Sequence, residues 1–400
     1  MIISSINAKI VKDSRNKDTV EASVNGQSAK CPSGASRGRH EAKTIDAKKA
    51  VQAIKKISKN FFGKEFEQKQ FDSMLIKLAG KNKSRLGANV TTPLSMAFCR
   101  AAAEENDKEL HEFIAETYGE NSAIPIPMMN VINGGAHAKG KLTMQEFMLV
   151  PIKFGSFESA FEACTTIYAK LRDIIKEFYG NIVLGDEGGF SPPIAITEHA
   201  LNLIDEALKR TGHEDKVKIG LDAAASQFFK NGKYHIDGKK LSGKEMQDYY
   251  LKLIEKYPII SIEDPFHEED WKNFAEFTKR TENKVMVVGD DLTATNTQRI
   301  RVAASKKACN LLILKVNQIG TVTEALEAAK LAGKHKWNII VSHRSGETTD
   351  SFIADLAVGI GAAFIKSGAP HTPFRLAKYH RLIEIEGKTG IGYAGKNFRI

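Results

Sequence analysis

Seven short apolar runs of the sequence each end in a charged or polar side chain, and side chains of these types could do acid–base or metal chemistry. The runs are NIVLGDE, VKIGLDA, PIISIED, VMVVGDD, LLILKVN, NIIVSHR and AAFIKSG, and they end at Glu187, Asp222, Glu263, Asp290, Lys315, His343 and Lys366. The last six are 41, 27, 25, 28 and 23 residues apart, and about 25 residues is the length of one strand, one helix and two loops. Because parallel strands of a barrel end on one rim, we expect these side chains to meet there.

Three of these residues, Asp222, Glu263 and Asp290, are carboxylates that neighbouring strand ends would bring together. Carboxylates at close range repel one another and raise each other's pKa, and a divalent cation between them removes that cost. Oxygen ligands favour Mg²⁺ or Mn²⁺ over zinc. The alternative is three separate solvated acids, and their shared position at strand ends argues against it.

The strand-end lysines and the acid of the DEGG segment are candidates for proton transfer. Lys315 ends the most apolar run of the chain, and an amine that is desolvated near metal cations should have a lowered pKa and could act as a general base. The alternative is an ordinary lysine whose ammonium reaches solvent, and Lys366 carries the same two interpretations. Glu187 lies at a sharp turn, where a raised pKa would make it a proton donor.

Several polar segments could hold a substrate around these groups. His343, Arg344 and Ser345 offer an imidazole, a guanidinium and a hydroxyl in succession, which suits a phosphate or a carboxylate. Alone, such a tripeptide is most often a polar loop. The segment SGASRG at 33–38 has small residues on both sides of Ser36, as a mobile lid would.

A second glycine-flanked segment, NGGAHAKG at 133–140, places His137 where it too can move. Gln145 and Glu146 follow in the short apolar run TMQEFMLV. Neither glycine segment is a P-loop, because the pattern GxxxxGK[ST] is absent from both.

The elements that must position these residues fall into two parts. Residues 1 to about 30 alternate apolar and polar positions, which predicts two or three antiparallel strands with turns at 16–18 and 25–26. Helical periodicity then dominates from about 42 to 118, so we expect residues 1–120 to form a smaller N-terminal α+β capping domain that carries the lid loop 33–38. Buried parallel strands alternating with helices predict a TIM-like (α/β) barrel catalytic domain over 125–400, and the fold class is α/β.

Composition narrows the class of protein further. The chain has 400 residues, of which 42% are hydrophobic and 26% charged, as in globular proteins, and no apolar run approaches the ~20 residues of a membrane helix. A start without a basic segment argues against a secretory signal, and four separate cysteines fit a reducing cytoplasm. The net charge of +10 fits a solvated lysine-rich surface; nucleic-acid binding is a minor alternative, because no RNP motif, zinc finger or arginine-rich arm is visible.

Over nearly its full length the sequence resembles the enolase family. The matching stretches are DSR, TVEASV, PSGASRG, RLGAN, NVINGGAHA, QEFM, GDEGGF, KIGLDAAAS, YPIISIEDPF, GDDLTATN, ILKVNQIGT, VSHRSGETTD, FIADLAVG, IKSGAP and RLAK. The resemblance implies a cytoplasmic lyase of glycolysis and gluconeogenesis that reversibly dehydrates 2-phosphoglycerate to phosphoenolpyruvate. It also implies two Mg²⁺ ions per active site and a homodimer or a higher homo-oligomer, with no membrane partner.

The resemblance also implies a role for each site residue. Asp222, Glu263 and Asp290 resemble the ligands of the first magnesium ion, and Ser36 resembles a ligand of the second when the lid closes. Lys315 resembles the general base and Glu187 the general acid. The family pattern gives the other site residues substrate-binding or supporting roles, with His137 and Glu146 also counted as catalytic: His137, Gln145, Glu146, His343, Arg344, Ser345 and Lys366.

Arg37 and Glu384 are among the positions that depart from the family pattern. Arg37 follows the lid serine where threonine is usual, and a bulky cation there is expected to pull toward the phosphate or to slow closure. Family dimers often pair an acid that Glu21 resembles with an arginine, but Glu384 stands at the arginine position, so we expect a dimer with different contacts. Two alternatives stay open: a superfamily relative that acts on another carboxylate substrate, and a non-enzymatic surface or RNA-binding role.

Overall fold

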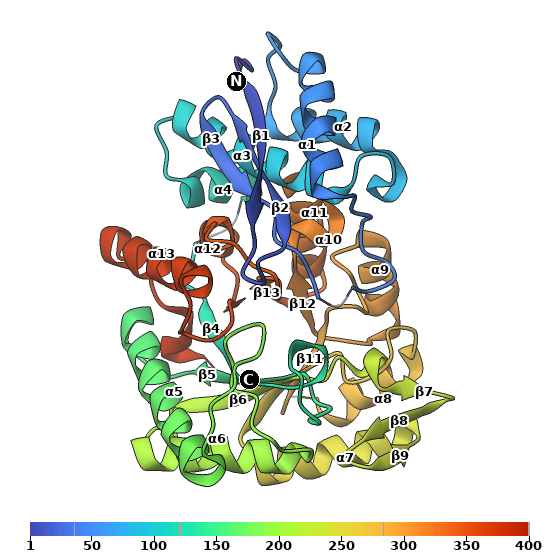
Figure 1. Cartoon of the computed structure of the whole chain (residues 1–400), viewed down its shortest axis with the longest axis vertical. Coiled ribbons are helices and arrows are strands. Elements are labelled where there is room, and N and C mark those ends of the chain that lie inside the picture. Colours follow the sequence, from blue (N-terminus) through green and yellow to red (C-terminus); the bar gives the residue numbers. More distant parts are fainter. Residues whose placement is uncertain (36, 120–121, 283, 399–400) are drawn as a thin grey trace.

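The computed structural model describes residues 1–35, 37–119, 122–282 and 284–398, so the lid residue Ser36 lies outside the described residues. The chain forms a smaller N-terminal domain, which lies above a closed barrel in Figure 1. The N-terminal domain begins with the antiparallel sheet β1-β2-β3, as the sequence predicted. Its strands are β1 (Ile6–Lys12), β2 (Asp18–Val24) and β3 (Gln27–Lys30). Asn25 and Gly26 both have positive φ, 48° and 90°, which suits the tight turn of a right-twisted hairpin.

Four helices complete the N-terminal domain, as the helical periodicity predicted. They are α1 (Ala47–Ile57), α2 (Gln68–Ala79), α3 (Ala88–Glu105) and α4 (Leu110–Tyr118). Asp46 begins α1 by accepting hydrogen bonds from the backbone N–H groups of Lys48 and Lys49. Helix α3 is buried along most of its length, and Phe98 on it stacks on Phe71 of α2 with ring centroids 4.3 Å apart. This aromatic contact and the covering sheet make the core of the domain.

The barrel consists of eight strands in the closed order β10-β11-β12-β13-β14-β4-β5-β6, which confirms the predicted TIM-like architecture. The strands are β4 (Ile126–Asn133), β5 (Glu146–Pro151), β6 (Val217–Asp222), β10 (Ile259–Glu263), β11 (Met286–Gly289), β12 (Leu311–Leu314), β13 (Asn338–Ser342) and β14 (Phe364–Lys366). The expectation of parallel strands throughout is wrong for β5, which is antiparallel to both β4 and β6. The connection 134–145 contains no α-helix to carry the chain back, so β5 returns beside β4 as in a hairpin.

The first of the seven apolar runs, NIVLGDE, is not a strand of the barrel. Within it only Leu184 pairs, in an isolated bridge with Phe190. The side chains of Val183 and Leu184 are 55% and 41% exposed, so this apolar run does not enter the core. The prediction that Glu187 ends a strand is therefore wrong, because β4 and β5 already close the barrel next to β6.

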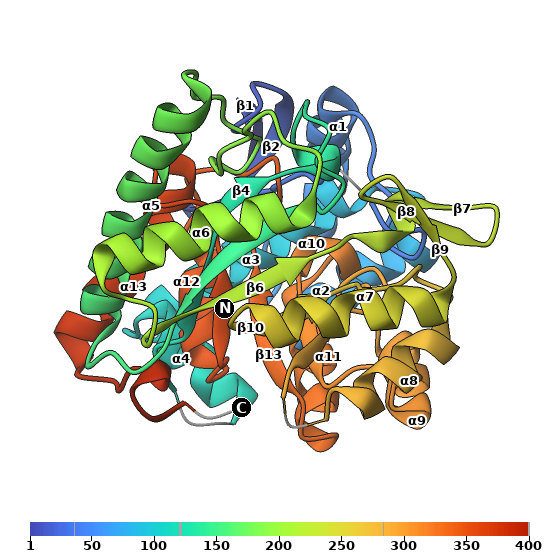
Figure 2. The same cartoon turned by 90° about the horizontal axis from the view of Figure 1, so that it is seen from below.

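Helices surround the barrel, as Figure 2 shows from below. They are α5 (Phe157–Tyr179), α6 (Thr197–Thr211), α7 (Gly243–Lys256), α8 (Trp271–Arg280), α9 (Thr297–Lys306), α10 (Val316–Ile319), α11 (Val322–Lys334), α12 (Phe352–Gly359) and α13 (Pro373–Thr389). A small antiparallel sheet precedes α7 and comprises β7 (Phe229–Lys230), β8 (Lys233–Ile236) and β9 (Lys239–Leu241). All four cysteines are free and buried.

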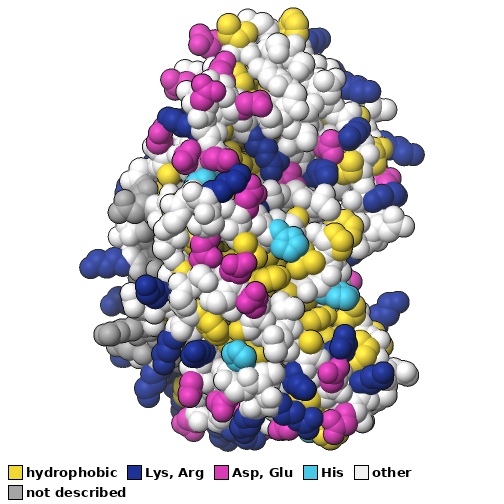
Figure 3. All heavy atoms as spheres, turned by 90° about the vertical axis from the view of Figure 1, so that its left-hand side faces the viewer, with side chains coloured by type: hydrophobic (Ala, Val, Ile, Leu, Met, Phe, Trp, Pro, Cys, Tyr) yellow, Lys and Arg dark blue, Asp and Glu magenta, His cyan; other side chains and the backbone are white. Residues whose placement is uncertain are grey.

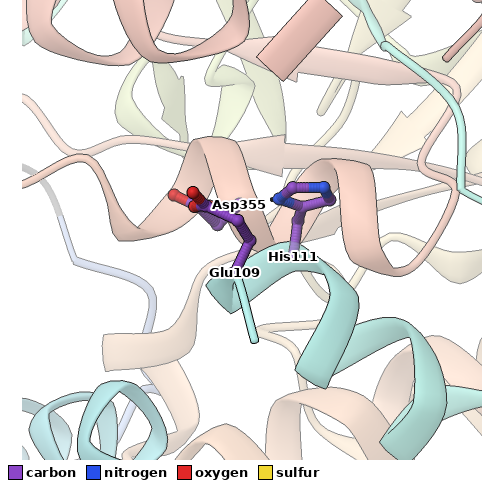
Figure 4. A group of neighbouring side chains, drawn as sticks. All are labelled: Glu109, His111 and Asp355. Carbon is purple, nitrogen blue, oxygen red and sulfur yellow. Dashed lines mark ion pairs between the residues drawn. The ribbon is translucent and has the colours of Figure 1, made fainter. Parts of the chain in front are cut away.

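A group of polar side chains fixes the N-terminal domain to the barrel helices. Glu109 and His111 belong to the start of α4 and lie next to Asp355 of α12 (Figure 4). The guanidinium of Arg381 on α13 donates to Asp355 at 2.7 Å and to Glu109 at 2.6 Å. The group has the composition of a metal site, but Arg381 already supplies the positive charge that these two carboxylates need.

The surface mixes both signs of charge. On the face drawn in Figure 3, lysine and arginine side chains are most numerous at the lower end, and acidic side chains lie among them. None of the helices in the described part of the chain is both long and apolar enough to span a bilayer.

Candidate active site

Six of the seven strand-end residues meet on one rim of the barrel, as predicted. Each either ends its strand or follows it directly: Asp222, Glu263, Asp290, Lys315, His343 and Lys366. One cavity is lined by every described residue of the predicted site except Glu263, together with Gly34 and Glu41 of the N-terminal domain. The rim therefore faces the loop that holds the predicted lid.

Lys366 joins three acids at the floor of this cavity. Its Nζ lies 2.9 Å from Glu263 Oε2, 3.0 Å from Glu146 Oε2 and 3.3 Å from Asp222 Oδ2. Burial alone would lower the pKa of Lys366, but these carboxylates raise it well above its ordinary value. Its side chain is only 3% exposed, so the interpretation as a lysine reaching solvent is wrong, and Lys366 is a fixed ammonium.

Lys315 makes an ion pair with Asp290, whose Oδ2 lies 2.5 Å from its Nζ. The amide of Gln318 donates to the other carboxylate oxygen of Asp290 at 2.8 Å. Burial alone would lower the pKa of Lys315, but Asp290 outweighs it and raises that pKa. The sequence predicted a lowered pKa for Lys315 beside bound metal cations. The polypeptide without metal does not lower this pKa.

The acidic rim has more carboxylates than its two lysines can neutralise, and this composition fits a divalent cation. Glu263 Oε1 is buried and has no hydrogen-bond partner among the described residues. Burial, and then the charge of Asp222, raise the pKa of Glu263 well above its usual range. Ligand oxygens of Asp264, Asp290 and Asp291 also lie within 4.8 Å of one another. Hard oxygen donors in excess are what Mg²⁺ and Ca²⁺ prefer.

Asp264 and Asp291 were not among the predicted ligands, and Asp264 has a structural task. Its two carboxylate oxygens accept the backbone N–H groups of Asp290 and Asp291 at 3.0 and 2.7 Å. It therefore fixes the turn from which Asp290 reaches the cavity. Burial and the charge of Asp290 raise the pKa of Asp291 to about 8. Asp291 is thus a further carboxyl group crowded against Asp290 at this end of the rim.

Glu187 reaches the same cavity from the turn after Leu184 rather than from a strand end. Asn130 donates to its Oε2 at 3.0 Å, and His343 Nε2 lies 3.4 Å from the same oxygen. Burial alone would raise the pKa of Glu187, but the imidazoles of His343 and His137 lower it well below its usual range. This is opposite to the raised pKa that the sequence predicted, because the surrounding donors stabilise the carboxylate.

His137 lies between two acids. Its Nδ1 is 3.2 Å from Glu146 Oε1 and 3.5 Å from Glu187 Oε1. Burial lowers the pKa of His137, but Glu187 and Glu146 more than offset it, so the pKa is raised. Nearby, the amide of Gln145 donates to Asp222 Oδ2 at 3.1 Å and orients this carboxylate. The structure thus brings His137, Gln145 and Glu146 into the site that the sequence predicted.

Arg344 and Ser345 connect the rim to the N-terminal domain. The Arg344 guanidinium makes a two-pronged ion pair with Glu41, and it also donates to Asn317 Oδ1 at 3.1 Å. Ser345 Oγ accepts the backbone N–H of Ala35 at 2.6 Å. The base of the lid loop is therefore attached to the segment that carries Arg344. Arg37, at the departure from the family pattern, is exposed and donates to Thr44 of its own loop at 2.5 Å.

Sequence reasoning missed several polar residues that orient the site. These are Glu41, Asn130, Asn317, Gln318 and Arg375, of which the last holds His343 through Nδ1. A signal existed for four of them, because Asn130 lies in the motif NVINGGAHA, Asn317 and Gln318 lie in ILKVNQIGT, and Arg375 lies in RLAK. Glu41 carried no such signal, since it lies neither in a quoted stretch nor at a strand end.

Comparisons with known proteins agree with this geometry. Residues 3–114 match the family model described as "Enolase, N-terminal domain", and residues 121–400 match "Enolase, C-terminal TIM barrel domain". The chain is also 45% identical, over 419 aligned positions, to a protein named "Enolase" from Methanocaldococcus jannaschii. That alignment covers 99% of this chain and 98% of the relative.

Proposed function

The chain belongs to the enolase family and is a phosphopyruvate hydratase, a lyase, and we propose that the rim residues carry out its reaction. The reaction is the reversible dehydration of 2-phosphoglycerate to phosphoenolpyruvate. The observation that carries the assignment of roles is one cavity lined by a lysine base candidate, a carboxyl acid candidate and an acidic rim. An elimination needs these three functions: removal of a proton, departure of hydroxide, and stabilisation of the charge that builds up.

A metal cofactor fits the acidic rim, and we propose Mg²⁺, with two ions per active site. Asp222, Glu263 and Asp290 would hold one ion, and the second would involve Ser36, which lies outside the described residues. When bound, a divalent cation stabilises the second negative charge that develops on the substrate carboxylate as its neighbouring carbon loses a proton. The unpartnered oxygen of Glu263 supports this assignment.

Lys315 is the proposed base. The proton it removes lies next to an ionised carboxylate and is very weakly acidic. The amine must be neutral to accept this proton, and in the free protein Asp290 holds it as an ammonium. Lys315 can therefore act as a base only when Asp290 no longer stabilises its ammonium form. The ion pair between the two residues thus controls whether Lys315 can accept the substrate proton.

Glu187 is the proposed acid, since hydroxide is a poor leaving group and has to leave as water. The donors around Glu187 favour its ionised form in the free protein. A substrate that brings phosphate and carboxylate charges into the cavity opposes that ionisation and raises the pKa of Glu187. We propose that the guanidinium of Arg344 and the hydroxyl of Ser345 bind the phosphate, because both line the cavity and both can donate hydrogen bonds to phosphate oxygens.

The proposal is tested by following phosphoenolpyruvate formation from 2-phosphoglycerate with purified full-length protein and Mg²⁺. We expect turnover that a chelator abolishes and that added Mg²⁺ restores. Unphosphorylated 2-hydroxy acids serve as the comparison, because a superfamily relative with another carboxylate substrate would turn them over instead. Absence of phosphoenolpyruvate formation with metal bound would reject the proposed function.

We further propose that the enzyme works in the cytoplasm in glycolysis and gluconeogenesis and forms a homodimer. Glu384 pairs with Arg381 at 3.1 Å and Lys388 at 2.7 Å within its own helix, and Glu21 pairs with Lys9 at 3.0 Å. Both acids already have partners within the chain, so we expect dimer contacts that do not depend on pairing either acid with a second subunit. Sedimentation at micromolar concentration tests this, and a monomer there would contradict the dimer.

A further inference from the structure

Arg375 of α13 is completely buried behind the site and has a dense set of contacts. Its Nη1 lies 2.5 Å from His343 Nδ1 and donates to the backbone carbonyl of Arg344 at 2.7 Å. Its Nη2 donates to the carbonyls of Ser345 and Asp186 at 2.6 and 3.0 Å. One guanidinium thus joins the segment proposed to receive the phosphate to the turn that carries the proposed acid.

The contact with His343 fixes where the imidazole carries its proton. A guanidinium in a protein is always protonated and has no acceptor atom, so it can only donate. His343 Nδ1 must therefore be the acceptor and carries no proton. A neutral ring then has its proton on Nε2, the nitrogen that lies 3.4 Å from Glu187 Oε2.

We propose that Arg375 is a positioning residue for the acid step: it holds His343 as the neutral tautomer with the proton on Nε2, facing Glu187. This inference rests on the proposed role of Glu187 as the acid. In this state His343 offers Glu187 a hydrogen-bond donor and cannot take the proton that Glu187 must deliver. His343 therefore does not compete with the substrate for the proton of Glu187.

The charges that face His343 support this assignment. Burial has the largest influence on the pKa of His343 and lowers it. The charge of Glu187 opposes this effect, whereas the charges of Arg375 and Lys366 add to it, and together they leave the pKa of His343 at about 3. A lowered pKa favours the neutral imidazole, in agreement with the tautomer that the contact with Arg375 requires. If the guanidinium of Arg375 were removed, His343 Nδ1 would lose both a nearby positive charge and its hydrogen-bond donor, and it could then bind a proton.

Gly368 lies where the imidazole, the guanidinium and the turn that carries Glu187 come together, and a side chain there would crowd all three. A Cβ atom on Gly368 would lie 3.1 Å from His343 Cε1, 2.9 Å from Arg375 Cδ and 2.8 Å from the backbone oxygen of Glu187. Gly368 also has a φ of 83°, which favours glycine. The imidazole, the guanidinium and the acid turn are thus packed against one glycine.

A matched control lies one turn along the same helix. Lys378 is also a buried cation; it donates to the carbonyls of Thr348 and Phe374 and lies 3.5 Å from Glu347. It supports the same polypeptide segment as Arg375 but does not contact His343. Lys378→Met therefore reports what loss of a buried cation from this helix does by itself.

The first experiment is ¹⁵N NMR of histidine-labelled, full-length, Mg²⁺-loaded protein, with His343 assigned from its loss in His343→Asn. We expect the pattern of a neutral ring protonated on Nε2 in the wild type, in Lys378→Met and in Arg375→Lys, which keeps a donor. In Arg375→Met we expect Nδ1 to gain a proton as the pH falls. A wild-type ring protonated on Nδ1 would overturn the proposal, and it would do so whatever the activity.

The second experiment is the pH profile of kcat for the same variants. We expect Arg375→Met to lose between ~10- and ~10⁴-fold in kcat, the range seen when an orienting partner or a tautomer is lost. Its acidic limb should move to higher pH, because a His343 cation would hold Glu187 ionised. Lys378→Met should keep the wild-type position of that limb. Equal profiles for Arg375→Met and Lys378→Met would show a structural role only and would overturn the proposal.

Discussion

The carboxylate of Glu41 and the guanidinium of Arg344 meet in a two-pronged ion pair, with oxygen–nitrogen distances of 2.9 and 3.0 Å. Both side chains are buried, at 7% and 5% exposure, although they come from different domains. A substrate phosphate that binds Arg344 therefore competes with an anion supplied by the protein itself. This arrangement compensates the charge of Arg344 in the free enzyme and places the N-terminal domain in contact with the substrate site.

Glu41→Gln should destabilise the free enzyme, because it leaves a buried guanidinium without its anion. Loss of one partner of a buried pair costs up to roughly 3–5 kcal/mol. We expect Tm to fall without ligand, and inorganic phosphate to raise Tm more in the variant than in the wild type. Thermal unfolding with and without phosphate measures both effects.

Glu384→Gln is the control for this prediction, since its pair with Lys388 is exposed and solvent-exposed pairs contribute little to stability. A phosphate-induced rise in Tm that is equal in Glu41→Gln and the wild type would contradict competition for Arg344.

Lys315→Met and Glu187→Gln should separate the two halves of the reaction. Each should lower kcat by ~10²–10⁴-fold, as acid–base groups do. Lys315→Met should also stop exchange of the substrate carbon-bound proton with deuterated water, whereas Glu187→Gln should retain it, because proton removal precedes loss of hydroxide. Mass spectrometry of recovered substrate measures the exchange.

The exposed Lys306 of α9 gives the matched control, and Lys306→Met should behave as the wild type. Exchange at the wild-type rate in Lys315→Met would remove Lys315 from the role of base.

Glu263 and Glu146 make nearly equal contacts with Lys366, at 2.9 and 3.0 Å, but only Glu263 is a proposed metal ligand. We expect Mg²⁺ to raise the Tm of the chelator-treated wild type and of Glu146→Gln, since a ligand stabilises the state that binds it. In Glu263→Gln this rise should be lost or should require far more Mg²⁺. Equal Mg²⁺ dependence in the two variants would contradict the ligand assignment.

Asp350 fastens the N-terminal domain to the barrel, and its pKa predicts a loss of stability in acid. It accepts from Arg100 of α3 and from the backbone N–H of Lys30 in β3, each at 2.8 to 2.9 Å. Burial would raise its pKa, but Arg100 and these hydrogen bonds lower it to about 2. A carboxyl with a depressed pKa stabilises the folded state above its unfolded pKa of about 4, and this stability is lost as pH falls toward the folded value.

Asp350→Asn should therefore lower the free energy of unfolding by about 2 kcal/mol at neutral pH and flatten its decline between pH about 5 and 3. Urea unfolding across that range measures both changes. Asp173→Asn removes an exposed pair with Arg172 and should leave the pH dependence as it is. A decline in Asp350→Asn as steep as in the wild type would contradict the linkage.

Local pattern was sufficient to place most of the site. Short continuous apolar runs that alternate with helices are typical of buried parallel strands, and the residue after each run then lies at the strand end. This reasoning placed Asp222, Glu263, Asp290 and Lys366 correctly. It failed at NIVLGDE, because apolar composition alone does not show whether a neighbouring strand is present to pair with the run.

The sequence by itself determined the fold class, the rim and most of the residues on it, since periodicity, strand length and motif are local properties. Only the tertiary structure decided which charges meet: Lys366 with three acids, Glu41 with Arg344, and Arg375 with His343. It also decided that the polypeptide without metal raises the pKa of Lys315 and lowers that of Glu187. The reason is physical, because a pKa and a tautomer depend on charges and donors a few ångströms away in space, and those partners lie far away along the chain.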